Sequence, residues 1–147
     1  MSKYETVFIK KQIGSEFTRD TWVNENEASE MDLKIVDSLI CCAIESLDEF
    51  NIKYTKQHIG FQCDGANGRG NNNFATIRLR KTKPLVFAIQ LNQLDSVEEM
   101  IQKARFETNG WNGWGYEVYI DREVISPVKS GLFSKLFQMA YEYNSSK

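Results

Sequence analysis

The residues with the clearest capacity for chemistry form a basic stretch in the middle of the chain. Arg78 and Arg80 stand two positions apart in a segment of alternating apolar and polar residues, so in a strand they share one face. The run continues into Lys81 and Lys83, and Arg69 lies in the adjoining loop. Such a row of cations can neutralise successive phosphates of a polynucleotide. The stretch therefore has three interpretations: a nucleic-acid contact, a contact for an acidic protein, or an ordinary solvated sheet face.

A second group of chemically capable side chains is aromatic. Trp111, Trp114 and Tyr116 fall within six residues and have glycines between them. Exposed rings beside arginines could stack on unpaired bases, and Trp, Tyr and Arg dominate the binding energy of protein interfaces. The two tryptophans therefore join the basic residues as candidate contacts for nucleic acid or a partner. The alternative, which the sequence favours, is that they fill the edge of the core while the glycines permit a turn.

No arrangement of residues predicts a catalytic or metal site. His58 is the single histidine, and with Cys63 it offers two ligands where a structural zinc site needs four. Cys41 and Cys42 are neighbours in a helical pattern and point in different directions. A catalytic cysteine–histidine pair needs a third group to orient it, and the sequence marks none. We predict a chain that is not an enzyme and has neither a metal site nor a cofactor.

The loop 65–70 has a glycine pattern that could cradle a phosphate. A phosphate loop lies between a strand and the N-terminus of a helix, whereas the residues that follow this loop alternate as in a strand. The sequence therefore favours a hairpin loop, in which Asn67-Gly68 supplies the positive φ of a tight turn.

Charge is polarised along the chain, although the net charge of the 147 residues is only −2. Residues 1–50 carry 5 basic and 11 acidic side chains, whereas residues 51–90 carry 7 basic side chains and a single acidic one, Asp64. The acidic region and the basic strand could neutralise each other within the fold, or each could face outward to a partner.

Composition and cysteine count bound the class of protein. With 41% hydrophobic and 12% aromatic residues the chain can bury a core, which excludes global disorder. No run approaches the roughly 18 apolar residues of a membrane helix, and the first residues contain no apolar leader segment, so we expect neither a membrane span nor a signal peptide. The odd number of cysteines, two of them adjacent, favours reduced thiols and a cytoplasmic location.

The apolar spacing predicts a helix, three strands, a helix, a strand and a helix, in that order. Residues 30–50 repeat apolar positions every three or four residues after a capping Ser29, and residues 74–81 alternate as in a half-exposed strand. The other expected elements are strands at 58–63, 85–91 and 116–120 and helices that start at Ser96, where Glu99 would complete a capping box, and at Ser126-Pro127. We predict an α+β fold: a single domain (30–147) whose antiparallel sheet of about four strands packs against two or three helices, after a partly irregular N-terminal extension (1–29).

Short motifs in this domain resemble those of a known family. They are the end of the first helix and a set of strand segments: Ile59-Gly60-Phe61, Asn73 to Arg78, Leu85-Val86-Phe87, and the Trp/Gly turn that runs into Tyr116-Glu117-Val118. From Asp32 to Tyr143 the chain resembles a family of domains of unknown function that occur alone or attached to nuclease-like and restriction-associated modules. Its layout is also distantly similar to the MmcQ/YjbR-like double-wing proteins, which are suspected DNA binders. The resemblance implies the fold and supplies no catalytic residues; the second tryptophan of the turn departs from the family pattern.

These observations predict a non-catalytic accessory module. It would contact nucleic acid, or a partner that processes nucleic acid, through Arg78, Arg80, Lys81 and the turn that holds Trp111 and Trp114. The alternative is a protein-interaction or regulatory module, a homodimer in one version, whose acidic N-terminal region and basic hairpin are complementary surfaces. An enzyme with an unrecognised site is the third and least supported hypothesis.

Overall fold

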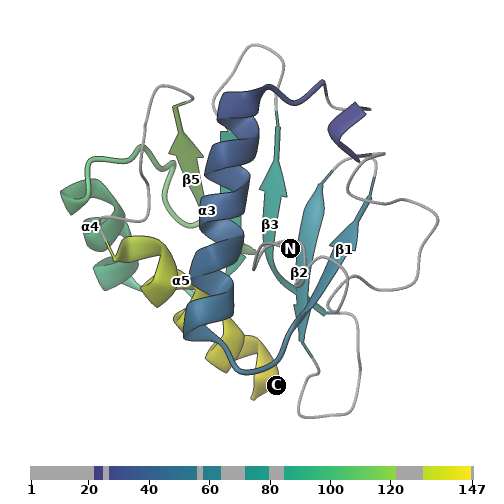
Figure 1. Cartoon of the computed structure of the whole chain (residues 1–147). Coiled ribbons are helices and arrows are strands. Elements are labelled where there is room, and N and C mark those ends of the chain that lie inside the picture. Colours follow the sequence, from purple (N-terminus) through teal and green to yellow (C-terminus); the bar gives the residue numbers. More distant parts are fainter. Residues whose placement is uncertain are drawn as a thin grey trace.

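The computed structural model of the chain describes residues 22–24, 27–55, 58–63, 72–79, 85–121 and 131–146. Within these residues, five strands form one antiparallel sheet in the order β1-β2-β3-β4-β5 (Figure 1). The strands are β1 (Asn51–Tyr54), β2 (Ile59–Cys63), β3 (Asn72–Arg78), β4 (Leu85–Gln90) and β5 (Gly115–Ile120), and the main helices are α3 (Glu30–Ser46), α4 (Asp95–Lys103) and α5 (Leu132–Ser145). The antiparallel α+β fold is confirmed, with one strand more than we expected.

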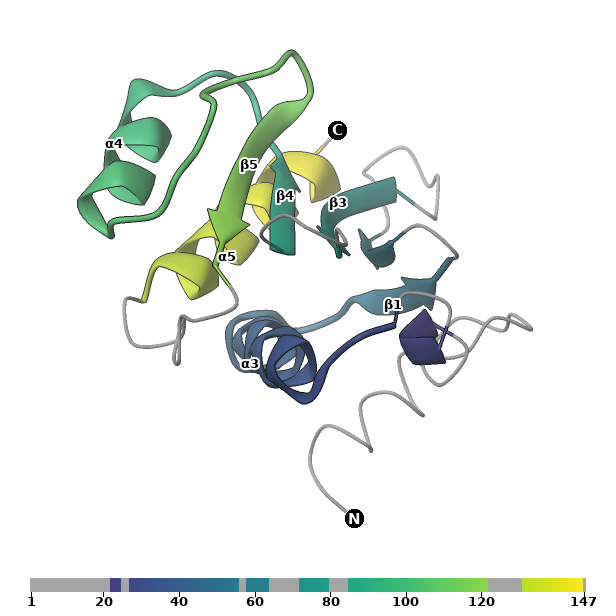
Figure 2. The same cartoon turned by 90° about the horizontal axis from the view of Figure 1, so that it is seen from above.

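Helices α3 and α5 lie together on one face of the sheet, and α4 stands beyond β5 (Figures 1 and 2). The core between the helices and the sheet is rich in aromatic rings. The ring of Phe137 on α5 lies 5.0 Å from that of Phe61 on β2 and 4.9 Å from that of Phe87 on β4, between ring centres. Because one α5 side chain bridges two strands that are not neighbours, α5 holds the middle of the sheet together.

Helix α3 begins where the sequence predicts and ends earlier. Ser29 accepts a hydrogen bond from the backbone N–H of Asp32, whose carboxylate accepts one from the N–H of Ser29, which completes a capping box. The helix stops at Ser46 because Leu47 takes an extended conformation. The predicted helix ran to residue 50 because Leu47 and Phe50 keep the helical spacing, although both are core residues outside the helix.

Strand β1 escaped prediction, and α4 starts differently from the prediction. Only Ile52 and Tyr54 mark β1 in the sequence, which is too short an alternation to identify a strand. The N-cap of α4 is Leu94 and not a serine, and its side chain makes no cap. Instead the hydroxyl of Tyr116 accepts from the N–H of Leu94 (2.8 Å) and donates to its carbonyl (2.9 Å). This tertiary contact fixes the start of α4 in place of the predicted capping box.

The edge of the sheet at β5 is partly covered by the segment that follows α4. The N–H of Tyr119 donates to the carbonyl of Glu107 (3.0 Å), and the side-chain amide of Asn109 donates to the hydroxyl of Tyr119 (2.8 Å). These bonds leave less of the β5 edge open for pairing with another chain. None of the helices in the described residues is long and apolar enough to cross a membrane.

Candidate functional site

Arg78, the central residue of the predicted basic strip, is engaged in an ion pair. It lies on β3 and pairs with Glu117 on β5, across the intervening strand β4. Arg78 stands opposite Val86 and Glu117 stands opposite Ala88, so the two long side chains reach over these short ones, which are buried. The side chain of Arg78 is 37% exposed and that of Glu117 is 20% exposed. The pair lies over the sheet face, and the carboxylate of Glu117 balances the charge of Arg78. Glu117 binds Nη2 of Arg78 and competes with an anionic ligand for the guanidinium.

A hydrogen-bond network extends this ion pair. The hydroxyl of Tyr119 donates to Oε1 of Glu117 (3.2 Å) and accepts from the side-chain amide of Asn109 (2.8 Å). Glu117 therefore has a second partner on its own strand and is held in place to receive Arg78. Arg78, Glu117, Tyr119 and Asn109 therefore form one hydrogen-bonded network that joins β3, β5 and the segment after α4.

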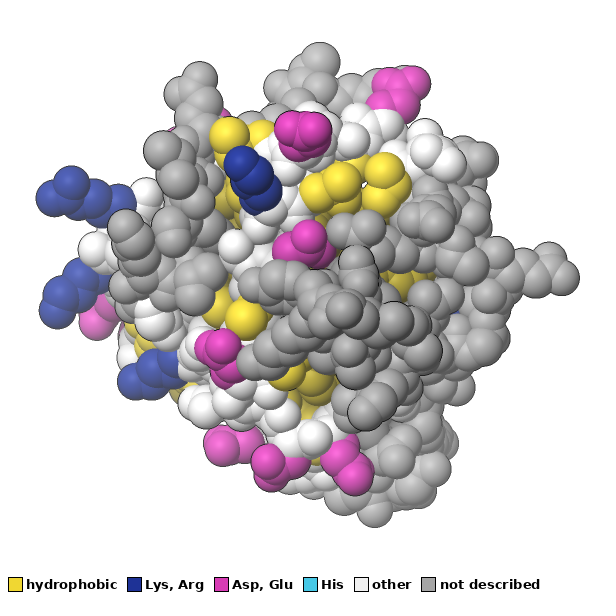
Figure 3. Space-filling view, in the orientation of Figure 1, with side chains coloured by type: hydrophobic (Ala, Val, Ile, Leu, Met, Phe, Trp, Pro, Cys, Tyr) yellow, Lys and Arg dark blue, Asp and Glu magenta, His cyan; other side chains and the backbone are white. Residues whose placement is uncertain are grey.

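The partner of Arg78 does not come from the acidic N-terminal region. Ile77, the neighbour of Arg78, is buried in the core beneath the helices, so Arg78 points to the face of β3 away from α3. Figure 3 views the molecule from the side of α3: acidic side chains stand over and below this helix, and the basic side chains visible on this face lie over the upper part of α3 and at the left margin, toward α4. The described part of the acidic region and Arg78 therefore lie on opposite faces of the sheet and do not pair.

The other predicted basic contacts lie outside the residues that the structure describes. They are Arg69, Arg80, Lys81 and Lys83, and the glycine-rich loop 65–70 lies outside the described residues as well. The last helix, predicted to start at Ser126-Pro127, begins at Leu132 after the N-cap Gly131, so that predicted start is wrong. A continuous row of cations on β3 therefore stays a prediction from the sequence, and Arg78 is the member whose environment is known.

The two tryptophans of the aromatic cluster are exposed, which corrects the expectation that they fill the edge of the core. Trp111 is 40% exposed and Trp114 is 37% exposed, whereas the third aromatic residue of the cluster, Tyr116, is buried. In the described residues the one other large hydrophobic side chain with comparable exposure is Met31 on α3. The prediction of burial failed because aromatic content alone does not reveal which side of a turn faces the core. We call residues 110–115 the tryptophan turn.

The backbone of Leu91 anchors both tryptophans. Its carbonyl accepts a hydrogen bond from the indole N–H of Trp111 (2.9 Å), and its N–H donates to the carbonyl of Trp114 (3.3 Å). Leu91 follows β4 directly, so the turn is tied to the end of a central strand. The indole of Trp111 thus has a fixed orientation, while the side chain of Trp114 is positioned through its backbone.

Asn112 and Gly113 close the turn from within. The side-chain carbonyl of Asn112 accepts from the N–H of Trp114 (3.0 Å) and from the N–H of Gly115 (2.9 Å). Gly113 has φ of +95°, a conformation that a residue with a side chain adopts only with strain. Asn112-Gly113 is the signal in the sequence that could have identified a rigid turn here. The turn is therefore ordered before any partner binds.

Carboxylates of α4 border the tryptophan turn. A methyl group placed on Gly110, next to Trp111, would lie 3.5 Å from Oε2 of Glu98. Asp95 and Glu99 are also exposed on α4. Asp95 lies three residues before Glu98 and four before Glu99, so all three carboxylates lie on neighbouring parts of the helix surface. The spacing of these residues in the sequence does not reveal that the acidic run borders the tryptophan turn. The surroundings of the turn are acidic.

His58 and Cys63 do not form a catalytic pair. They stand at the two ends of β2, and five residues of extended chain at about 3.3 Å each separate them by roughly 16 Å. None of the three cysteines forms a disulfide, and burial raises the pKa of the Cys42 thiol above its ordinary value. Within the described residues no three His, Cys, Asp or Glu side chains gather as a metal ion would require.

Burial lowers the pKa of His58 below its ordinary value, and the charges of Arg78 and Lys53 lower it further. A group whose pKa is lower in the folded state binds protons more tightly when the chain unfolds. The stability associated with neutral His58 is therefore fully present above about pH 6.5 and is lost as the pH falls through that value toward the folded pKa.

We expect the urea midpoint of the wild-type chain to drop more between about pH 7.5 and about pH 5 than that of His58→Gln. The measurement is a pair of urea titrations for each protein, followed by tryptophan fluorescence. Other groups also titrate in this range, so the comparison between the two proteins isolates His58. Equal drops in both would contradict the prediction.

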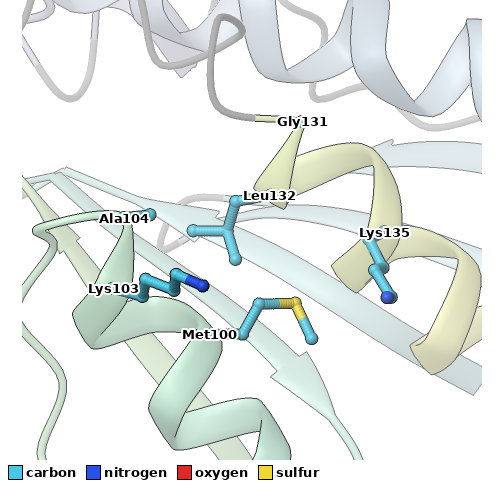
Figure 4. Close-up of a pocket in the computed structure, with 6 residues that line it drawn as sticks. All are labelled: Met100, Lys103, Ala104, Gly131, Leu132 and Lys135. Carbon is cyan, nitrogen blue, oxygen red and sulfur yellow. The ribbon is translucent and has the colours of Figure 1, made fainter.

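A groove lies between α4 and α5 (Figure 4), and a second cavity lies between the end of α3 and α5. The groove has a volume of about 340 Å³ and is lined by Met100, Lys103, Ala104, Gly131, Leu132 and Lys135. The two lysines stand on opposite helices around an apolar floor (Figure 4). The described residues of this lining carry neither a carboxylate nor a thiol, hydroxyl or imidazole, so they offer no nucleophile or general base of the usual kinds at neutral pH.

Comparison of the chain with protein-family models, with curated proteins and with solved structures gives no match. The resemblance to a family of domains of unknown function therefore stays a prediction from the sequence motifs.

Proposed function

We propose that this chain is a non-catalytic module that binds a protein partner through the tryptophan turn. The observation that carries the proposal is the exposure of Trp111 and Trp114 on a turn whose backbone is already fixed by Leu91 and Asn112. Tryptophan is the residue type most enriched among the few that dominate binding energy in protein interfaces. A turn that is ordered beforehand loses little conformational entropy when a partner binds.

A protein partner is favoured over nucleic acid by the charges around these residues. Glu98 lies against Gly110, and Asp95 and Glu99 are exposed nearby, so a phosphate backbone would meet carboxylates beside the rings. Arg78, which the nucleic-acid hypothesis places at the centre of the contact, is neutralised by Glu117. Arg78 is the one member of the predicted basic strip among the described residues, and its pairing with Glu117 weakens it as a contact for the phosphates of stacked bases.

The test compares Trp114→Ser with the wild-type chain. Trp114 is the suitable position because its backbone makes the hydrogen bonds of the turn, while the indole of Trp111 is tied to Leu91 and its loss would disturb the fold. Met31→Ser is the matched control, since it removes another exposed large hydrophobic side chain from a distant helix. Each full-length chain is used to retrieve proteins from cells of its source, and each retrieved protein is then titrated in purified form by calorimetry.

We expect a retrieved partner to bind Trp114→Ser at least about tenfold more weakly than wild type, and to bind Met31→Ser with unchanged affinity. Equal affinity for all three chains would overturn the proposal. Anisotropy titrations with labelled single-stranded DNA, duplex DNA and RNA form the second arm. Salt-sensitive binding to any of them that Trp114→Ser abolishes would replace the protein partner by nucleic acid. Light scattering of the chain alone reports whether the partner is a second copy.

A further inference from the structure

The chain segments around the tryptophan turn carry more acidic than basic residues. Residues 85–121 contain six acidic residues, Asp95, Glu98, Glu99, Glu107, Glu117 and Asp121, and two basic ones, Lys103 and Arg105. Glu117 is paired with Arg78 on the sheet face, so the carboxylates nearest the turn are those of α4. Glu98 brings this negative charge to Gly110, the residue directly before Trp111.

The position of the carboxylates in α4 stabilises their negative charges. Asp95 and Glu98 occupy the first turn of α4, where the positive end of the helix dipole stabilises negative charge. One oxygen of Glu98 also accepts a long hydrogen bond from the amide of Gln102 (3.5 Å). Neither interaction removes the negative charge, so the surface keeps a negative potential that a bound cation would neutralise.

Indole rings and carboxylates select the same kind of ligand. The face of tryptophan attracts a Lys ammonium or an Arg guanidinium more strongly than the face of any other side chain, and a carboxylate at the rim adds a charge-assisted hydrogen bond. A phosphate or an acidic peptide would be attracted by neither. Because the two tryptophans are three residues apart on an open turn and not in a closed cavity, an extended chain segment can reach both.

We propose that the partner of the tryptophan turn presents a segment rich in Arg or Lys, whose cations lie on Trp111 and Trp114 and pair with the carboxylates of Glu98, Glu99 and Asp95. This inference rests on the proposed function and names the chemistry of its partner. It also assigns a role to the acidic face of α4, as the rim that steers a basic segment onto the rings.

The experiment uses two fluorescein-labelled peptides of about twelve residues, one alternating Ala and Arg and the other alternating Ala and Glu, with anisotropy as the readout. We expect the Arg peptide to bind and its affinity to fall about tenfold from about 50 mM to about 300 mM NaCl, with no binding of the Glu peptide. Glu98→Gln combined with Glu99→Gln should weaken the Arg peptide about fivefold or more.

The matched control is Asp48→Asn combined with Glu142→Gln, which removes the same charge from the second cavity, between the end of α3 and α5. This control should leave the affinity unchanged. Equal weakening by both double variants would show that the peptide senses net charge only and would overturn the inference, as would equal binding of the Glu peptide.

The two proposals fail in different ways. If Trp114→Ser weakens a partner found by retrieval while the Glu98/Glu99 variant binds that partner as wild type does, the turn is a protein-binding site and its partner is not basic. If neither variant affects the partner, the proposed function itself fails. Weakening by both variants supports both proposals. Circular dichroism and the urea midpoint of each variant establish that it is folded.

Discussion

Replacing Gly115 by alanine is expected to destabilise the fold by about 3 kcal/mol or more, the largest effect that a single added methyl group should have in this chain. A Cβ atom at this position would overlap the carbonyl oxygen of Ile89 and would stand 2.9 Å from Cα of Gln90. Both are backbone atoms of β4, so no side-chain rotation can relieve the overlap. The start of β5 must move away from β4, which breaks the pairing between Gln90 and Gly115.

The control for this variant is Gly113→Ala, two residues earlier in the same turn. Gly113 has φ of +95°, and no atom of the described residues lies within 4 Å of where its Cβ would stand. Alanine there meets backbone strain alone and should cost about 1–2 kcal/mol. Urea titrations of the three proteins give the comparison. A Gly115→Ala chain as stable as Gly113→Ala would show that β5 can shift without loss.

The Gly115 variant also tests whether partner binding requires an ordered tryptophan turn. The N–H of Gly115 is one of two donors to the side chain of Asn112, so a shift of β5 loosens the tryptophan turn. We therefore expect Gly115→Ala to lose partner binding together with stability, whereas Trp114→Ser loses binding with little change in stability. The pair of variants shows whether the rings bind as exposed side chains alone or require a turn that is ordered beforehand.

Local patterns in the sequence were sufficient for the elements that depend on local physics. The apolar spacing after Ser29 predicts α3, since both the cap and the periodic face are properties of neighbouring residues. The alternation from Phe74 onward predicts β3 for the same reason. The predicted start of α4 failed because it depends on a nonlocal contact. Tyr116 binds the backbone at the start of α4 from 22 residues away, which no capping pattern in the sequence reveals.

The candidate site depended on nonlocal contacts even more. Arg78 and Glu117 are 39 residues apart, and their pairing requires the strand order β3-β4-β5 together with short side chains at the positions between them. The sequence identified Arg78 as a cation but could not show that it was already neutralised. In the same way, the sequence identified Trp111 and Trp114 but not their exposure, because the backbone of Leu91, 20 residues before Trp111, determines where the turn lies.

The exposed aromatic side chains are therefore better supported as the proposed binding surface than the basic strip. Burial would have placed the tryptophans in the core, where they would stabilise the fold and do nothing more. Their exposure leaves a large apolar surface that solvent disfavours and that a partner would cover. Because Asn112, Gly113 and Leu91 hold the turn in this conformation, the exposure is built into the fold and does not depend on a flexible loop.

The second large effect is expected for Phe137→Ala on α5, which should lower the free energy of unfolding by about 3–5 kcal/mol. Phe137 is completely buried, and its ring packs edge-on against Phe61 of β2 and Phe87 of β4. Removing the ring leaves a cavity between α5 and the middle of the sheet, and neither strand can move in to fill it without breaking its own pairing. Since small domains have a total stability of about 5–15 kcal/mol, the variant should be close to unfolding at room temperature.

Two control variants on α5 test whether the loss of stability comes from the cavity. Phe137→Leu keeps most of the apolar volume and should cost less than half as much as the alanine variant, because the cavity is smaller. Gln138→Ala changes the exposed neighbour and should alter the stability by no more than about 0.5 kcal/mol. Urea midpoints give the order of the three variants. If Phe137→Ala and Gln138→Ala were equally stable, α5 would not be packed against the sheet as described. In that case another element would have to support β4, and through β4 also Leu91 and the tryptophan turn.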